Sequence, residues 1–190
     1  LDALRALSLG AQRRTLRFAE LAAQHGMPCK TVSYGATPTF MNHVPILSGI
    51  TELRPGTYAL MDASQGAAIS TLDRCAATVL ATVISRPTDT RTILDVGAKG
   101  LTMQTRTEGI CAVAGRGTLY DTPEVHIEKV FDEHAIVNDR AFHDRVQVGD
   151  KVRIIPVHIC PVCNLYDRAY LISGDTVVQE LDIACRGRLQ

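Results

Sequence analysis

The sequence of 190 residues has no excess of charge of either sign. Its 20 Lys and Arg residues balance 20 Asp and Glu residues, and the sequence pI is about 7.1. Because no basic cluster marks one segment, nothing attracts the chain to nucleic acid or to an anionic membrane surface. We therefore expect its partner to be a small molecule or another protein.

Long apolar runs are also missing. No stretch approaches the roughly 20 apolar residues that a membrane helix needs. The opening segment Leu1 to Arg5 has neither the basic start nor the apolar middle of a signal peptide. We expect a cytoplasmic protein with no membrane partner.

Closely spaced cysteines are few. The six Cys residues are scattered through a chain that is 46% hydrophobic, and a chain of this length can bury a core without disulfides. We therefore expect reduced thiols. Internal repeats and low-complexity segments are absent from the sequence, which excludes a solenoid.

The first part of the chain alternates helix and strand signals. Apolar residues recur at helical intervals from Leu4 to His25, and Gly10 is a point where this helix could break in two. The β-branched run from Cys29 to Tyr34 is typical of a strand. A loop, a helix and a strand are expected next, at 35–39, 42–48 and 57–61. Because two such units cannot close a parallel barrel, we expect a further N-terminal part.

The pattern changes near Cys75, and we place a domain boundary near residue 72, which gives domains 1–72 and 73–190. Beyond this point short β-branched runs are separated by turn residues such as Pro87 and Gly97. Strands are expected at 76–85, 92–96, 110–114, 126–132, 151–155, 170–172 and 176–184. The second domain is therefore expected to be a mostly antiparallel β domain, and the fold class is α+β.

The most specific cluster is His158-Ile-Cys160-Pro-Val-Cys163, which follows an apolar run. If the strand continues through it, His158 and Cys160 share a face and present an imidazole beside a thiolate. This pair suits zinc, and two protein ligands leave positions open for substrate, as in a catalytic site. Cys163 is a candidate third ligand. The alternative is that Cys160 and Cys163 form a lone C-x-x-C pair, either redox-active or without function.

A second candidate is the loop from Ser33 to Thr39. It follows an expected strand and offers small residues, backbone N–H groups and two threonine hydroxyls, which can surround a phosphate. In barrel enzymes a phosphate commonly binds in the loops after the last two strands. The same Gly-x-Thr-Pro pattern also occurs in ordinary turns.

A third candidate is Phe131-Asp-Glu-His134, at the end of an expected strand. Its side chains could supply a general acid or base, or a water-mediated contact to a metal. The alternative is a solvated surface cluster. The other histidines lie near expected helix ends or loops and are assigned no role: His25, His43, His126 and His143.

In their order and spacing, five segments resemble the family of D-serine dehydratase and D-threonine aldolase. The segments are Val32 to Thr39, Thr51 to Asp62, Leu94 to Lys99, Asp132 to His134 and Val152 to Pro161. These are pyridoxal-phosphate enzymes of fold type III, related to alanine racemase. The resemblance covers nearly the whole chain, and His-x-Cys-Pro is its most specific motif. It implies the last strands and helices of an alanine racemase-like (β/α) barrel, followed by the β domain.

The resemblance also implies where cofactor and metal bind. The implied cofactor-binding residues are Tyr34, Gly35, Ala36, Thr37, Thr39, Tyr58 and Asp62. His158 and Cys160 would hold zinc, or another divalent metal, beside the 3-hydroxyl of a D-amino acid substrate. His134 is the candidate catalytic residue. The implied activity is that of a lyase on 3-hydroxy-D-amino acids, either a dehydratase or an aldolase.

Several positions depart from the family pattern. Ala135 stands where a glycine is usual, and Cys163 where a small residue without a thiol is usual. Some aldolases of the family carry aspartate where Cys160 stands, so the cysteine favours dehydration. None of the four lysines lies in the family's Schiff-base context: Lys30, Lys99, Lys129 and Lys151. The cofactor lysine is therefore expected in an absent N-terminal part, and this chain alone is expected to be inactive.

Two other interpretations stay open. A non-catalytic metal-binding or interaction domain would use His158, Cys160 and Cys163 as a structural site. An amino-acid racemase shares the wider fold, although moving an α-proton does not require a metal beside the substrate. Because an incomplete barrel exposes sheet edges and members of this fold usually pair, we expect a homodimer or a two-chain assembly.

Overall fold

The longest element is the N-terminal helix. In the computed structural model, which describes residues 1–188, α1 spans Asp2–Gln24 without interruption. The helix does not break at Gly10, the point where a break was considered, because one glycine costs a helix only about 1 kcal/mol. The buried side-chain amide of Gln12 attaches α1 to the segment 45–47. It donates to the Pro45 carbonyl at 3.1 Å and accepts the Leu47 N–H at 2.8 Å. None of the helices in residues 1–188 combines the length and the apolar character needed to cross a membrane.

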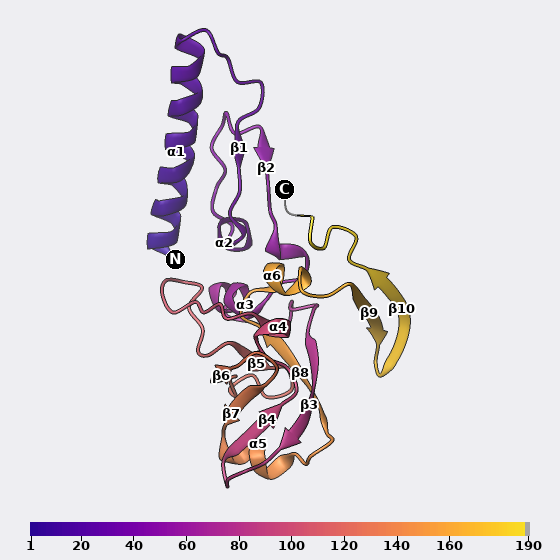
Figure 1. Cartoon of the computed structure of the whole chain (residues 1–190). Helices are drawn as coiled ribbons and strands as arrows, with labels where there is room; N and C mark the ends of the chain where they lie inside the picture. Colours follow the sequence, from indigo (N-terminus) through magenta and orange to yellow (C-terminus); the bar gives the residue numbers. More distant parts are fainter. Residues whose placement is uncertain (189–190) are drawn as a thin grey trace.

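Two short strands run beside α1 (Figure 1). β1 (Ser33–Tyr34) and β2 (Glu52–Leu53) pair in parallel, and α2 (Thr37–Met41) lies between them in sequence. The helix expected at 42–48 is therefore placed too late, because Pro38 sits in the first turn of α2, where its missing N–H is tolerated. The strand expected at 57–61 is instead a 3-10 turn, η1 (Thr57–Ala59). The backbone changes direction after η1 at Met61, which has a left-handed conformation with φ 57°.

The second half contains a six-stranded, curled sheet in which every pairing is antiparallel (Figure 1). The strand order is β5-β8-β3-β4-β7-β6. The strands are β3 (Val79–Ser85), β4 (Arg91–Leu94), β5 (Gly117–Leu119), β6 (Lys129–Val130), β7 (Ala135–Asn138) and β8 (Lys151–Pro156). The antiparallel character predicted from sequence is confirmed. That residues 1–72 are the end of a barrel, and that they form a separate domain, stay predictions.

Two of the strands expected from the sequence differ in the structure. The segment 110–114 is not a strand, and β5 begins only at Gly117. A Cβ at Gly117 would lie 2.8 Å from the Ile155 carbonyl oxygen, so glycine allows β8 to approach here. The expected strand 126–132 contains only the short β6, and β7 was not anticipated.

The core lies between the curled sheet and the helices around it. α3 (Ala63–Ile69) leads into the β domain, α4 (Ala98–Leu101) follows β4, α5 (Arg140–Arg145) follows β7 and α6 (Ile159–Cys163) follows β8. Apolar sheet side chains with no exposed surface are Val83, Leu94, Ala135, Val137 and Ile154. Ile159 and Val162 of α6 belong to the same apolar cluster. The helix that carries the two motif cysteines is thus anchored in the core.

A two-stranded hairpin projects from this body (Figure 1). Within the described part of the chain, β9 (Arg168–Ser173) and β10 (Thr176–Asp182) pair only with each other, and all their residues are exposed. An ion pair of 2.8 Å between Arg168 and Glu180 links the strands. Large apolar side chains remain in solvent, including Tyr170, Leu171 and Val177.

The start of α4 is locked to the turn between β6 and β7. The Ala98 N–H donates to the Phe131 carbonyl at 2.6 Å, and the Lys99 N–H donates to the Asp132 carbonyl at 3.2 Å. A Cβ on Gly97 would overlap both carbonyl oxygens. The close approach of these two backbones therefore requires glycine at this position.

We predict that Gly97→Ala lowers the free energy of unfolding by about 1–3 kcal/mol, because the added methyl forces α4 away from the turn. Urea denaturation measures the change. Gly56→Ala is the matched control, because a Cβ there meets nothing within 4 Å. Equal effects of the two substitutions would show that this backbone contact does not constrain the fold.

Candidate metal and cofactor site

The His-x-Cys motif lies at a strand end and not within the strand. β8 ends at Pro156, His158 is the N-cap of α6 with φ −143° and ψ 114°, and Cys160 lies in the first helical turn. The expectation that His158 and Cys160 share a strand face is therefore wrong. Pro161 explains the difference, because proline is tolerated in a first helical turn but removes a donor from a strand.

A buried carboxylate fixes this turn. Asp62 has no exposed surface and caps α3, where its Oδ1 accepts the Gln65 N–H at 2.8 Å and the Ser64 hydroxyl at 2.9 Å. Its Oδ2 accepts the Ile159 N–H at 3.1 Å, from 97 positions along the chain. The Ser64 N–H also donates to the Val157 carbonyl at 3.3 Å. The starts of α3 and α6 are therefore held together by one side chain. Both carboxylate oxygens of Asp62 accept hydrogen bonds from the chain itself, which gives this residue a positioning role. Its contact with the cofactor stays a prediction.

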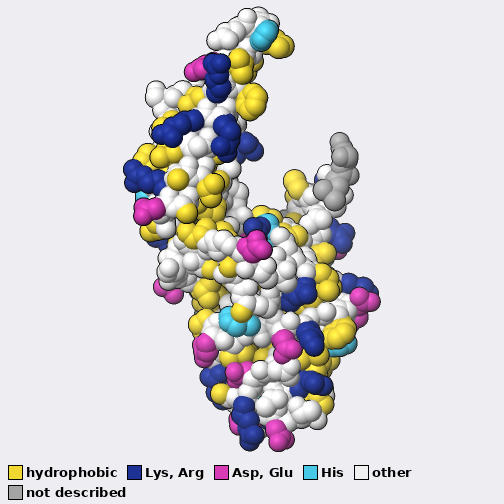
Figure 2. Space-filling model, turned by 90° about the vertical axis from the view of Figure 1, so that its left-hand side faces the viewer, with side chains coloured by type: hydrophobic (Ala, Val, Ile, Leu, Met, Phe, Trp, Pro, Cys, Tyr) yellow, Lys and Arg dark blue, Asp and Glu magenta, His cyan; other side chains and the backbone are white. Residues whose placement is uncertain are grey.

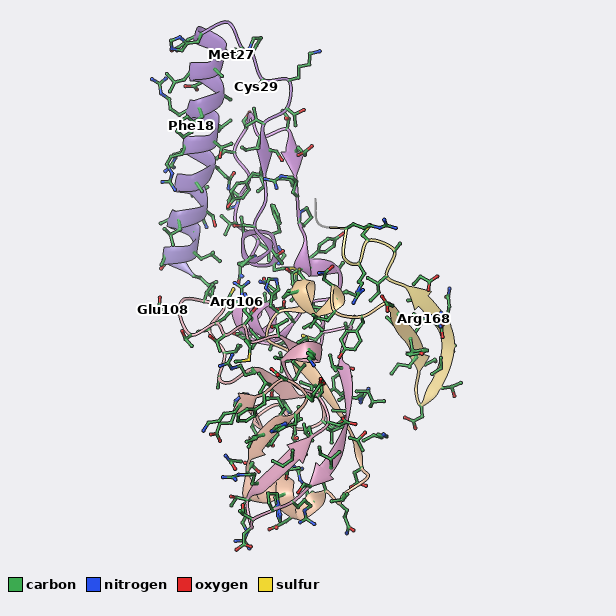
Figure 3. The ribbon with its side chains drawn as sticks, viewed as in Figure 1. Phe18, Met27, Cys29, Arg106, Glu108 and Arg168 are labelled. Carbon is green, nitrogen blue, oxygen red and sulfur yellow. The ribbon has the colours of Figure 1, made fainter. Side chains whose placement is uncertain are left out.

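The imidazole of His158 contacts the loop 102–116 between α4 and β5. Its Nδ1 lies 3.0 Å from an Nη of Arg106 and 3.2 Å from Oε1 of Gln104. Burial lowers the pKa of His158, the Arg106 charge lowers it further, and Asp62 acts in the opposite direction. The ring is therefore neutral near pH 7, which is the form that binds a metal. Figure 3 shows Arg106 on the loop that lies near the N-terminal end of α1.

The two motif cysteines have different surroundings. Cys160 is exposed, and its Sγ lies 3.5 Å from Oγ1 of Thr57 in η1. Cys163 is half-buried against the core, and burial, followed by the nearby Cys160, raises the pKa of its thiol. In residues 1–188 no group of three His, Cys, Asp or Glu side chains is arranged to hold a metal. That Cys163 is a third ligand stays a prediction.

The donor set at the motif fits an open metal site. An imidazole and a thiol are the ligand types that zinc takes, and both come from positions two residues apart at a well-anchored helix start. The thiol of Cys160 is accessible, and Nδ1 of His158 already has partners, which leaves Nε2 as the nitrogen for a metal. Two donors leave room for substrate or water.

The Thr39 hydroxyl, predicted to contact phosphate, is turned into the protein. Thr39 is 1% exposed, and its Oγ1 lies 3.0 Å from the Tyr34 hydroxyl and 2.8 Å from the Ser8 hydroxyl of α1. Tyr34 and Thr37 are also buried. These side chains fix the shape of the loop.

Gly35 and Ala36 form the accessible part of the same loop. The Thr39 and Phe40 N–H groups both donate to the Ala36 carbonyl, which starts α2. A Cβ on Gly35 would lie 2.8 Å from the Arg54 carbonyl oxygen, so the neighbouring chain requires glycine here. The surface of the loop is therefore mostly backbone, which suits an anion held by N–H groups.

His134 lies in the turn between β6 and β7. Its ring stacks on Phe131 with centroids 4.8 Å apart, and its carbonyl accepts the Phe131 N–H at 2.8 Å. Among residues 1–188 none of the described interactions joins His134 to His158 or Cys160. Its catalytic role stays a prediction.

Three residues at the site were missed from sequence. Gln104 and Arg106 lie in an irregular loop more than 50 positions before His158, and Thr57 lies still further away. No periodicity or spacing connects such positions. The only available signal was the family segment that contains Thr57.

Solved structures share the fold of this chain. D-threo-3-hydroxyaspartate dehydratase from Delftia sp. HT23 matches with a TM-score of 0.81 at 26% identity, over 95% of this chain and 51% of that chain. D-threonine aldolase from Filomicrobium marinum matches with a TM-score of 0.77 at 26% identity, over 100% and 50%. The dehydratase also matches as a histidine-to-alanine variant and as a cysteine-to-alanine variant in the metal-free form; the two altered residues are two positions apart. The chain thus has the fold seen in about half of each of these enzymes.

Sequence comparison defines the family. The family model of the serine dehydratase domain matches residues 76–172. D-threonine aldolase of Arthrobacter sp is 31% identical over 183 residues, which is 93% of this chain and 45% of that protein. The chain belongs to the family of D-serine dehydratase and D-threonine aldolase, and the resemblance noted in the sequence is confirmed. It spans about half the length of the curated relatives it matches.

We predict that Asp62→Asn lowers the free energy of unfolding by about 1–3 kcal/mol, because an amide N–H2 in place of one oxygen leaves a buried donor unpaired. It should also speed hydrogen exchange at the Ile159 amide. Asp139→Asn is the control, because Asp139 caps α5 through one bond to the Phe142 N–H and asparagine caps equally well. Unchanged exchange at Ile159 would contradict the positioning role.

Proposed function

We propose that this chain is the metal-carrying part of a pyridoxal-phosphate-dependent lyase that acts on 3-hydroxy-D-amino acids. One observation carries the proposal: His158 and Cys160 offer a neutral imidazole and an accessible thiol at a helix start that Asp62 holds in place. The fold is shared with an aldolase and a dehydratase of such substrates. In the dehydratase variants, the altered histidine and cysteine have the same spacing, and one variant is metal-free.

The proposed metal is zinc or another divalent ion. When bound, it supplies a Lewis acid that polarises the substrate 3-hydroxyl. His158 and Cys160 hold it, and the Thr57 hydroxyl lies against the thiol. Because residues 1–188 supply no third ligand in a cluster, an open catalytic site is favoured over a closed structural one.

The proposed cofactor site adjoins the metal site. Pyridoxal phosphate, when bound, supplies an electron sink for bond breaking at the α-carbon. We assign its phosphate to the loop surface at Gly35 and Ala36, with the buried Tyr34, Thr37 and Thr39 fixing that loop. Tyr58, which is 52% exposed, follows the residue that contacts Cys160. The turn η1 therefore adjoins the metal site directly. His134 remains the proposed acid or base.

We propose that the lysine which binds the cofactor lies outside this chain. All four lysines are exposed. Lys99 pairs with Glu133, Lys129 lies 3.8 Å from Glu128, and Lys151 donates to the Thr82 hydroxyl at 2.6 Å. These contacts give Lys99, Lys129 and Lys151 surface roles, and the chain alone is therefore expected to be inactive.

The outer face of α1 offers a surface for a further part of the barrel. Figure 2 shows hydrophobic side chains among the basic ones along this helix. Leu7 is 70% and Phe18 71% exposed, and their spacing of 11 residues places them on one helix face. Exposed apolar side chains grouped on one face mark a surface that a partner can cover. We propose that a further barrel segment covers α1 in the active enzyme. The homodimer stays a prediction.

The activity is tested in a chimera in which this chain replaces the matching stretch of the Arthrobacter D-threonine aldolase. With pyridoxal phosphate and zinc, an aldolase releases glycine from D-threonine or 3-hydroxy-D-aspartate, and a dehydratase releases ammonia and a 2-oxo acid. We expect one of these products. Cys160→Ser should lower the rate at least about 100-fold. Loss of only the hydrogen-bond partner of a metal ligand costs about 10- to 100-fold, and loss of the ligand itself costs more.

Cys163→Ser is the matched control and should retain activity, because that thiol packs against the core. A folded chimera that binds both cofactor and metal but releases neither product would refute the proposed function.

A further inference from the structure

The two partners of His158 make opposite demands on one nitrogen. The Arg106 guanidinium can only donate a hydrogen bond, so its contact of 3.0 Å requires Nδ1 to carry no proton. The Gln104 Oε1 can only accept, so its contact of 3.2 Å requires Nδ1–H. A neutral imidazole satisfies one of them at a time. The loop 102–116 therefore presents His158 with two alternative tautomers.

Metal binding selects between these tautomers. Because Nδ1 faces the loop, Nε2 is the nitrogen left for a metal, and a metal on Nε2 requires the ring proton on Nδ1. An acceptor for that proton orients the ring and raises its basicity. Gln104 meets this need, whereas Arg106 offers a donor and a positive charge at the same place.

We propose that Gln104 is the positioning residue that sets the metal-binding tautomer of His158, and that Arg106 competes with it and weakens metal binding. The inference rests on the proposed function, since it requires a metal at His158 and Cys160. It adds that the loop 102–116 controls how tightly the metal binds.

Arg106 has little to hold it against His158. Within residues 1–188 its Nε is buried without a hydrogen-bond partner, while Nη contacts the imidazole. The Arg106 carbonyl accepts the Val113 N–H at 2.8 Å, so the backbone of the loop is fixed independently of the guanidinium. The side chain can therefore leave Nδ1 without unfolding the loop.

The test is a cobalt titration of the 190-residue chain, read by the thiolate-to-cobalt absorption band and by competition with a chromophoric chelator. Gln104→Leu should weaken cobalt binding about 10- to 100-fold, the effect typical of losing the partner of a metal-bound histidine. Gln104→Glu keeps an acceptor and should bind at least as tightly as the wild-type chain. Arg106→Met should strengthen cobalt binding about tenfold, because it removes a positive charge from beside the bound metal ion. One neighbouring charge commonly changes the stability of a charged group by about this factor.

Two controls separate this effect from others. Arg91→Met removes the same charge from an exposed position on β4 and should leave the affinity unchanged. The urea midpoint of each variant reports folding. If Gln104→Leu does not fold, Gln104→Glu and Arg106→Met still test the proposal. Purely structural roles for Gln104 and Arg106 predict no gain in cobalt affinity.

The possible failures are distinct. Affinities within about twofold of wild type for the Gln104 and Arg106 variants would overturn this inference and leave the metal site standing. A wild-type chain without the thiolate band, indistinguishable from Cys160→Ser, would contradict the proposed site and the inference with it.

Discussion

The buried Asp62 carboxylate is the contact on which the site depends. It accepts hydrogen bonds from Gln65, Ser64 and Ile159, and so joins the first part of the chain to the turn after β8. Hydrogen bonds to an ionised acceptor are stronger than neutral ones, and removing one partner leaves a buried polar group unpaired. The relative position of α3 and α6 is therefore fixed by chemistry as well as by packing.

This contact brings three segments together around His158 and Cys160. η1 reaches the thiol through Thr57, the loop 102–116 reaches the imidazole, and α6 itself is anchored by Ile159 and Val162 in the core. The sheet supplies the support, because Ile154 and Ile155 of β8 are almost fully buried just before the motif. The metal ligands thus stand on a rigid base, while their partners come from more irregular segments.

Much of this was predictable from sequence because the signals are local. Alternating β-branched residues predicted β3, β4, β8, β9 and β10, and the His-x-Cys-Pro motif singled out His158 and Cys160. The error at the motif has a physical cause, because Pro161 lies in the first turn of α6 where a strand was expected. The partners Gln104 and Arg106 could not be found, because only the folded chain brings positions 54 and 52 residues apart into contact.

The assignment of His158 and Cys160 as a metal-binding pair is tested most directly by X-ray absorption at the zinc edge of the metal-loaded chain. One sulfur at about 2.3 Å with nitrogen or oxygen neighbours at about 2.0–2.1 Å is the predicted result. Two sulfur neighbours would bring Cys163 into the site and indicate a structural metal. A shell without sulfur would contradict the assignment altogether.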